Sequence, residues 1–355
     1  MPLLHHLMHQ CGDKIASIIL NILLTNDQID LNYRFNGASP LIYALKNKFP
    51  RCALLLASDK RVEVNIKLPE IVDKKLAGTT ALMLALMGSE CMIAVTEYLL
   101  SEREKLHVKY ADSSGLTPLM AACSTGHTYA VAELLKLDQT MILARNKFNE
   151  TAFYYAVFSK NIDIINMLLQ HENTDEELIN NKSKHNYTAL SFAAKLDRTA
   201  IALKILDSGM CDVNIPTEDG DTALIFAVRN KNVNLVAELL KHGADPNLVN
   251  GKGNRALDEA VKISDKVDRD TCSIIVDLLL NSGADINPKN PKTGVSTIEL
   301  AASEKNNLVA IRLLQRESNS SETAVDYLRF SLFNRLSQSG SQDESAKPKP
   351  FSISI

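Results

Sequence analysis

Apolar residues gather in two short blocks between Asp112 and Leu135, where the sequence reads D-S-S-G-L-T-P-L-M-A-A-C-S-T-G-H-T-Y-A-V-A-E-L-L. The first block opens at Thr117 and Pro118, and a threonine can cap a helix whose first turn accepts a proline. The second block follows Gly126, a residue that favours a turn. Within each block the apolar spacing is that of an amphipathic helix. The stretch therefore predicts two short antiparallel helices joined by a turn.

The same pattern recurs along most of the chain. A leucine pair or a similar apolar pair follows most of the anchor residues by about 17 positions, and successive anchors lie 33 to 41 residues apart. A single helix pair cannot bury its own apolar face, so we expect the copies to stack on one another. Besides Thr117, the anchors are Ser39, Thr80, Thr151, Thr188, Thr222, Arg255 and Ser296.

The T-P-L-x-x-A opening, the repeat period and the closing loops G-A-D-P-N and G-A-D-I-N resemble the ankyrin-repeat family. The resemblance covers residues 1–316 and implies an all-α solenoid of about nine helix-turn-helix repeats with short hairpin loops. Residues 317–336 are amphipathic and are expected to form a C-terminal capping helix, with docking on a partner as the alternative. Residues 337–355 are polar and are expected to be disordered.

The start of the chain, residues 1–24, is expected to form a terminal repeat with polar side chains on its outer surface, which would keep that end soluble. His5 and His9 are spaced as a helical metal-ligand pair would be. Because no H-E-x-x-H arrangement and no third ligand accompany them, we interpret them as solvated histidines.

Composition narrows the classes of function. The chain has 355 residues, 45% hydrophobic and 5% aromatic, and its net charge of -3 gives no general attraction to nucleic acid or anionic membranes. No apolar run approaches the roughly 18 to 20 residues of a membrane span, and the N-terminus lacks the basic region of a signal peptide. Six cysteines without a C-x-x-C motif indicate reduced thiols. We expect a cytoplasmic monomer.

Catalytic motifs are missing from the sequence. It contains no G-x-S-x-G, no glycine-rich phosphate loop and no H-E-x-x-H, so we predict neither catalytic residues nor cofactors and interpret the protein as a non-enzyme. An enzyme with an unrecognised active site stays the least favoured alternative, and a structure with a deep polar pocket would reveal it.

Binding is the remaining chemistry. The resemblance implies a concave face made by the hairpin tips before each Gly-x-Thr and by the positions seven and eight after each Thr. Aromatic residues beside cations are typical of protein-binding hot spots, so we expect this face to bind an acidic, partly apolar segment of a partner protein. The candidate residues are Lys147, Phe148, Phe158, Lys184, His185, Tyr187, Lys195, Glu218, Asp219, Asp221 and Arg229.

Two biological roles stay open at this point. The chain is similar to the ankyrin-repeat effectors that intracellular bacteria deliver into host cells, because its repeats are irregular, it is rich in Asn, Lys and Ile, and its polar tail ends in F-S-I-S-I. In that role the tail would be a translocation signal and the protein would act in the host cytosol. The alternative is a general cytosolic adaptor of the cell that makes it.

Overall fold

The computed structural model describes residues 3–69, 76–88, 90–102, 106–263, 269–304 and 306–318. The contacts divide the chain into two compact units, Met1–Glu218 and Asp219–Ile355, called unit 1 and unit 2 below. The described part of each unit consists of short helices and contains no β-strand, only isolated bridges such as that between Phe35 and Ala38. The all-α class predicted from the sequence is confirmed for the described residues, whereas the number of repeats stays a prediction.

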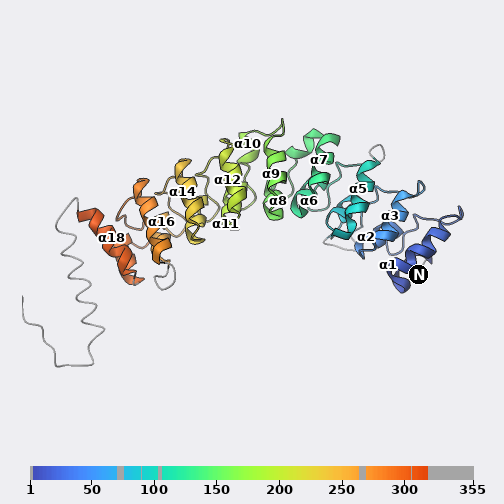
Figure 1. Ribbon diagram of the computed structural model, residues 1–355, viewed down its shortest axis with the longest axis horizontal. Coiled ribbons are helices and arrows are strands. Elements are labelled where there is room, and N and C mark those ends of the chain that lie inside the picture. Colours follow the sequence, from blue (N-terminus) through green and yellow to red (C-terminus); the bar gives the residue numbers. More distant parts are fainter. Residues whose placement is uncertain are drawn as a thin grey trace, which may run out of the picture. The chain divides into compact units, whose positions relative to one another are not determined.

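Helices in both units follow one another in pairs, and Figure 1 shows α6 beside α7 and α8 beside α9. Unit 1 contains α1 (Leu3–Leu23), α2 (Pro40–Lys46), α3 (Pro50–Ser58), α4 (Ala81–Leu86), the 3₁₀ helix η1 (Glu90–Met92), α5 (Ile93–Ser101), α6 (Pro118–Thr125), α7 (Thr128–Leu137), the 3₁₀ helix η3 (Gln139–Leu143), α8 (Ala152–Ser159), α9 (Ile162–Leu169), α10 (Glu176–Ile179), α11 (Ala189–Lys195) and α12 (Thr199–Asp207). Unit 2 contains α13 (Ala223–Arg229), α14 (Val233–Lys241), α15 (Ala256–Val261), α16 (Arg269–Asn281), α17 (Thr297–Ser303) and α18 (Asn307–Ser318).

The repeat of α6 and α7 forms for the reasons that its sequence indicates. Thr117 accepts a hydrogen bond from the amide of Met120 through Oγ1 at 3.3 Å, and Pro118 occupies the first turn of α6. Gly126 ends α6 with a φ of 82°, a left-handed conformation that glycine adopts without a steric cost. Hydroxyl caps also begin α2, α4, α11, α13 and α17.

Two anchors depart from this capping scheme. Thr151 makes no side-chain hydrogen bond at the start of α8. At the start of α15, where Arg255 replaces threonine, the carboxylate of Asp258 instead accepts a hydrogen bond from the Arg255 amide at 2.9 Å. Asp258 is buried and also accepts a hydrogen bond from the Thr297 hydroxyl at 2.7 Å, which joins α15 to the start of α17.

Neighbouring repeats pack through small residues. In unit 1, α6 contacts both α4 and α8, while α7 contacts α5 and α9. Ala122 on α6 and Ala156 on α8 are completely buried, and their short side chains allow the helices to approach closely. On the outer helix α7, Val131 and Leu134 are equally buried. The core therefore runs from repeat to repeat within unit 1. This is expected because a single repeat cannot bury its own apolar face.

Successive hairpin tips are also joined by backbone hydrogen bonds. In unit 1 the amide of Lys147 donates to the carbonyl of Ser114 at 2.9 Å, and the amide of Lys184 donates to that of Phe148 at 2.7 Å. Gly115 lies at one such junction with a φ of 84°, and a Cβ atom there would lie 2.9 Å from the Cα of Asn146. Glycine is therefore required at this position by both conformation and space.

The first helix corrects two expectations from the sequence. Gly12 has a non-helical φ of 67° that divides α1 into an inner and an outer segment, as a helix pair requires. The outer surface was expected to be polar, but Ile15, Ile18 and Ile22 are 55%, 60% and 66% exposed, so that expectation is wrong. The interpretation of His5 as solvated is also wrong, because its ring is completely buried.

The histidine is buried because the second repeat supplies a partner for it. Its Nε2 atom lies 3.0 Å from the carbonyl oxygen of Ala38, which belongs to the hairpin before α2. The rings of Phe35 and Tyr43 lie 5.7 and 5.2 Å from it, measured between centroids. Burial lowers the pKa of His5, so the ring is neutral near pH 7.

All six cysteines carry free thiols. Cys52, Cys123 and Cys272 are buried, while Cys91 is exposed. The predicted C-terminal capping helix lies outside the described residues from residue 319 on, and so does the predicted disordered tail, residues 337–355.

Candidate functional site

Five aromatic rings form one cluster on unit 1, and this group is called the aromatic cluster below. Tyr154 and Phe192 stack with centroids 4.2 Å apart and planes at 18°. Phe158 meets the edge of Phe192 at 5.0 Å, and Tyr187 meets it at 5.9 Å. Tyr155 completes the cluster at 6.4 Å from Phe158. Offset and edge-on aromatic pairs at such distances stabilise their own arrangement.

The helical period of α8 places three of these rings on one side of the helix. Phe153, Ala156 and Val157 are buried in the core, so Tyr154 and Phe158, four residues apart, point away from it. Phe192 comes from α11, the inner helix of the next repeat, and Tyr187 from the hairpin just before it. The cluster thus depends on two neighbouring repeats.

Polar groups fix the phenols at the border of the cluster. Lys195 donates from Nζ to the hydroxyl of Tyr187 at 2.6 Å, and the same ammonium lies 4.4 Å from the centre of that ring. Tyr155 donates to the carboxylate of Glu150 at 2.8 Å and accepts from the amide of Asn146 at 2.9 Å. The border therefore offers a cation beside preorganised rings.

Burial and the nearby Glu150 charge raise the pKa of Tyr154 to about 12. Burial and the hydrogen bond to Glu150 also raise the pKa of Tyr155. Both phenols therefore stay protonated at neutral pH, where they can act as hydrogen-bond donors.

The hairpin tips of unit 1 hold the other predicted site residues. Lys147, Phe148 and Lys184 are exposed, and the backbone bond between Lys184 and Phe148 holds their two tips next to each other. His185 faces Glu218, with Nδ1 and a carboxylate oxygen 2.9 Å apart. Both side chains of that pair are exposed, so its contribution to stability is small.

The last three predicted site residues lie in unit 2. Two of them, Asp221 and Arg229, belong to a network of ion pairs and hydrogen bonds. Asp221 is buried and receives Nη2 of Arg229 at 2.9 Å as well as the amide of Asn250 at 2.8 Å. Arg229 also donates from Nε to Glu259 at 3.1 Å. The sequence suggested surface charges at Asp221 and Arg229, and the structure places them in this ion-pair network. The side chain of Asp219 is exposed.

Glu259 is the acidic centre of the network in unit 2. Its burial would by itself raise the pKa, but hydrogen bonds from Arg229 and Asn254 outweigh this effect and lower the pKa of Glu259 to about 2. Arg229 is affected in the opposite sense, because Glu259 and Asp221 raise its pKa against the effect of burial.

Three members of the aromatic cluster were missed by the sequence reasoning. Tyr154, Tyr155 and Phe192 occupy positions three and four after the anchor threonine, whereas the predicted face comprised only the hairpin tips and positions seven and eight. An aromatic residue at position four also occurs in S-P-L-I-Y-A and T-A-L-I-F-A, but only T-A-F-Y-Y-A has one at position three as well. The two adjacent tyrosines of this motif, followed by the phenylalanine of T-A-L-S-F-A in the next repeat, were the available signal.

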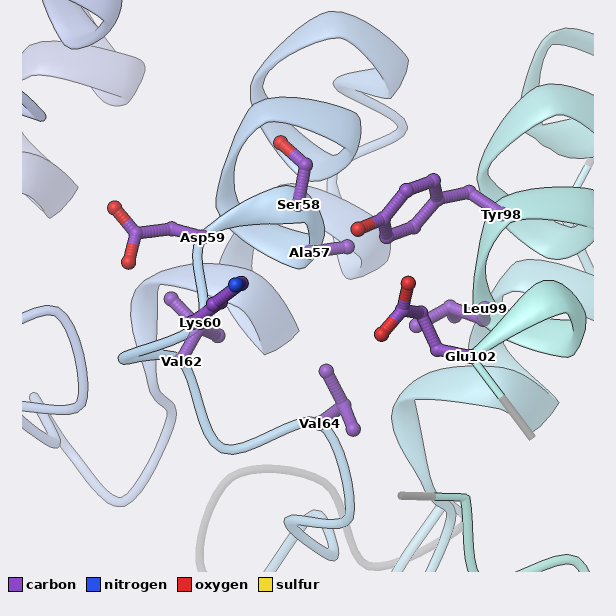
Figure 2. A pocket seen from close by; sticks show the side chains of 9 residues that line it. All are labelled: Ala57, Ser58, Asp59, Lys60, Val62, Val64, Tyr98, Leu99 and Glu102. Carbon is purple, nitrogen blue, oxygen red and sulfur yellow. The ribbon is translucent and has the colours of Figure 1, made fainter. Parts of the chain in front are cut away.

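A small pocket lies elsewhere in unit 1, between α3 and α5, and Figure 2 shows its lining. The hydroxyl of Tyr98 and the carboxylate of Glu102 face it from one side, and Ala57 and Ser58 lie opposite. Its volume of about 60 Å³ is room for roughly two water molecules. Within the described residues, no group of three or more His, Cys, Asp or Glu side chains is arranged to hold a metal ion.

Comparison with known proteins agrees with this architecture. A family model of three ankyrin repeats matches residues 68–143, 93–178, 173–250 and 202–290, which together extend over more than half of the chain. The chain belongs to the ankyrin-repeat family. Ankyrin repeats form scaffolds for protein–protein interaction, and their fold is typically non-catalytic.

Individual ankyrin-repeat relatives are distant. The chain is 27% identical over 150 residues to the ankyrin repeat protein L371 of Acanthamoeba polyphaga mimivirus, a match to 42% of this chain and 19% of that protein. It is 27% identical over 211 residues to the B-cell lymphoma 3 protein homolog of Mus musculus, a match to 58% of this chain and 44% of that protein. The matches thus span less than half the length of either relative.

Among solved ankyrin structures, the ankyrin repeat domain of Bcl-3 aligns with a TM-score of 0.52 and 22% sequence identity. The alignment covers 66% of this chain and 97% of that domain. At this identity the likeness shows the ankyrin fold alone. In the described part of the chain, no helix combines the length and hydrophobicity that a membrane span would need.

Proposed function

We propose that the protein is a non-catalytic scaffold whose unit 1 binds an acidic, partly apolar segment of a partner protein. The observation that carries the proposal is the aromatic cluster with Lys195 at its border. Phe158 is 46% exposed although it contacts three other rings, so the cluster leaves apolar area available to a partner. Aromatic area that is held in place binds at little entropic cost.

The chemistry of the partner follows from the groups that surround the rings. Lys147, Lys184 and Lys195 supply positive charge on the hairpin tips and on the end of α11. Phe148, 46% exposed, adds a further apolar contact at the tip. A partner segment with Asp or Glu beside Leu, Phe or Met would place its apolar side chains on the rings and its carboxylates near the lysines. Glu218, paired with His185, would disfavour acidic residues at that end.

The experiment uses a displayed library of short peptides selected on the full-length protein. Enriched sequences should combine acidic with apolar residues, and their affinity should fall at least tenfold for the Phe148→Ala and Tyr187→Ala double variant, because two aromatic contacts beside the lysines are lost. The thermal midpoint should stay nearly unchanged, since neither ring is completely buried.

A matched control is available in the same unit. Tyr129 on α7 is 49% exposed and lies outside the aromatic cluster. Tyr129→Ala should leave peptide affinity unchanged. Equal losses for the double variant and the control, or an enrichment of basic peptides, would contradict the proposed face.

We also propose that the protein acts in the cytosol as a monomer, in the effector role. The supporting features are its irregular repeats and the sequence of residues 337–355. Removal of residues 337–355 should abolish delivery into a host cell while peptide binding is retained. Delivery that persists without the tail would favour the adaptor role in the producing cell.

A further inference from the structure

The hairpin tips of unit 1 repeat one backbone conformation. Two residues form the end of each tip and are called the first and second tip residues below, and a residue with a left-handed conformation follows them. The pairs are Leu76–Ala77, Ser113–Ser114, Lys147–Phe148 and Lys184–His185, and the residues after them are Gly78, Gly115, Asn149 and Asn186, with φ between 56° and 84°. Because the backbone sets the direction of each Cβ atom, equivalent side chains leave successive tips in equivalent directions.

Main-chain hydrogen bonds connect these tips in one register. At each junction the amide of a first tip residue donates to the carbonyl of the second tip residue of the preceding repeat. The distances are 2.8 Å from Ser113 to Ala77, 2.9 Å from Lys147 to Ser114, 2.7 Å from Lys184 to Phe148 and 3.1 Å from Glu218 to His185. The first tip residues Ser113, Lys147, Lys184 and Glu218 therefore form a regular line, called the tip row below.

The spacing of the tip row follows from the helices behind it. Lys147 and Lys184 precede the first residues of α8 and α11 by the same number of positions. These two helices pack side by side in unit 1. Since the axes of packed helices lie about 8–10 Å apart, successive first tip residues are separated by about the same distance.

Charge changes along the tip row in a defined order. All four of its side chains are exposed. Ser113 is neutral, Lys147 and Lys184 are positive, and Glu218 is negative. Phe148, 46% exposed, follows Lys147 directly and supplies an apolar contact beside the two lysines. A complementary partner therefore needs two acidic groups and then a basic group, each about one repeat from the next.

A polyproline II segment fits this spacing. It has three residues per turn and rises about 3.1 Å per residue, so side chains three positions apart point the same way and lie about 9 Å apart. An α-helix would need about seven residues for each step and about 15 for the three charges. Isolated helices of that length are marginal in water, whereas polyproline II is already populated by unfolded chains, so an extended segment has the smaller ordering cost.

We propose that the tip row binds a polyproline II segment of the partner with two acidic residues three positions apart and a basic residue three positions further. In this arrangement the acidic residues pair with Lys147 and Lys184, and the basic residue pairs with Glu218. The inference rests on the function proposed above and adds the conformation and charge spacing of the bound segment.

The test compares three peptides of equal composition, each made in both chain directions, by NMR titration of the full-length protein at low salt. D-L-P-D-L-P-K has the proposed spacing, while D-L-D-P-L-P-K and D-L-P-L-D-P-K place the acids two and four positions apart. The first should bind about threefold more tightly than the others and shift the amide signals of Lys147 and Lys184, because only it satisfies both exposed lysines.

A fourth peptide tests the helical alternative. D-A-A-L-A-A-A-D-A-A-L-A-A-A-K carries the same charges at seven-residue spacing. Tighter binding of this peptide than of D-L-P-D-L-P-K would overturn the extended conformation. Equal binding of the three short peptides would refute the spacing while leaving an acidic, apolar partner in place. If none of the four peptides binds, the proposed function fails as well.

A charge reversal tests the third position of the tip row. The unmodified protein should prefer D-L-P-D-L-P-K to D-L-P-D-L-P-E by about threefold, and Glu218→Lys should reverse this preference. Glu172→Lys makes the same charge change at an exposed residue between α9 and α10 and should keep the original preference. Thermal melts verify that both variants are folded. An unreversed preference in the Glu218 variant would remove that residue from the site and refute the proposed order of charges.

Discussion

Individual side chains in this protein have roles that depend on residues from the next repeat. Asp221 looks like an exposed acidic tip in the sequence, but Arg229, eight residues later, and Asn250 close over it. His5 looks solvated, but the carbonyl of Ala38 lies 33 residues away and is not evident from the local sequence. Repeat-to-repeat contacts of this kind decide whether a polar group is structural or available to a partner.

Glu259 should make the protein sensitive to acid. Its folded pKa of about 2 lies below the ordinary value of 4.5, so its ionised form stabilises the fold above about pH 4.5, and this contribution is lost as the pH falls toward 2. We expect Glu259→Gln to reduce the loss of unfolding free energy between about pH 5 and pH 2 by on the order of 1–3 kcal/mol. Urea titrations over that pH range measure it.

Glu218→Gln serves as the control for this acid effect, because that carboxylate is exposed and faces only the exposed His185. It should follow the unmodified protein at each pH. If Glu259→Gln loses as much unfolding free energy between pH 5 and pH 2 as the unmodified protein and Glu218→Gln do, the ion pair with Arg229 does not stabilise the fold.

At the scale of helices, the sequence was sufficient to predict where a single helix begins and ends, because those signals are local. The anchor threonine and the following proline predicted the start of α6, and the glycine at position 126 predicted its end. The sequence was insufficient where two helices meet. The stack of Tyr154 on Phe192 joins residues 38 positions apart, from α8 and α11, and the exposed isoleucines of α1 contradict the polar surface expected of a terminal repeat.

The unequal caps of α6 and α8 offer a matched pair of substitutions. Thr117 accepts a hydrogen bond from the first turn of α6, whereas Thr151 makes no such bond at α8, and both residues are buried. Thr117→Ala should therefore lower the unfolding free energy by about 1 kcal/mol more than Thr151→Ala. Denaturant unfolding of both variants measures the difference, and equal costs would mean that the observed cap contributes nothing.

At the scale of the whole molecule, stability is expected to be a sum of repeat and neighbour terms instead of one all-or-none quantity. The division into two compact units agrees with this view. The single array over residues 1–316 that the sequence suggested stays a prediction. Motifs identify the repeats, but whether the repeats unfold together depends on the interaction free energies between neighbours, which motifs do not give.

A pair of core substitutions tests the extent of cooperativity. Leu134 on α7 in unit 1 and Leu279 on α16 in unit 2 are both completely buried, so either change to alanine should cost about 2–5 kcal/mol. We expect amide hydrogen exchange to accelerate chiefly in the unit that carries the substitution. Uniform acceleration through both units after either change would instead indicate a single cooperative molecule.

The bond between Lys184 and Phe148 uses only main-chain atoms, and so does the bond between Lys147 and Ser114. Their side chains take no part in that linkage. Mutational drift at these positions can therefore alter which ligands are selected while the spacing of the loops persists. Selectivity in such a protein is free to diverge faster than its framework, and an engineer could retarget it by exchanging a few exposed side chains.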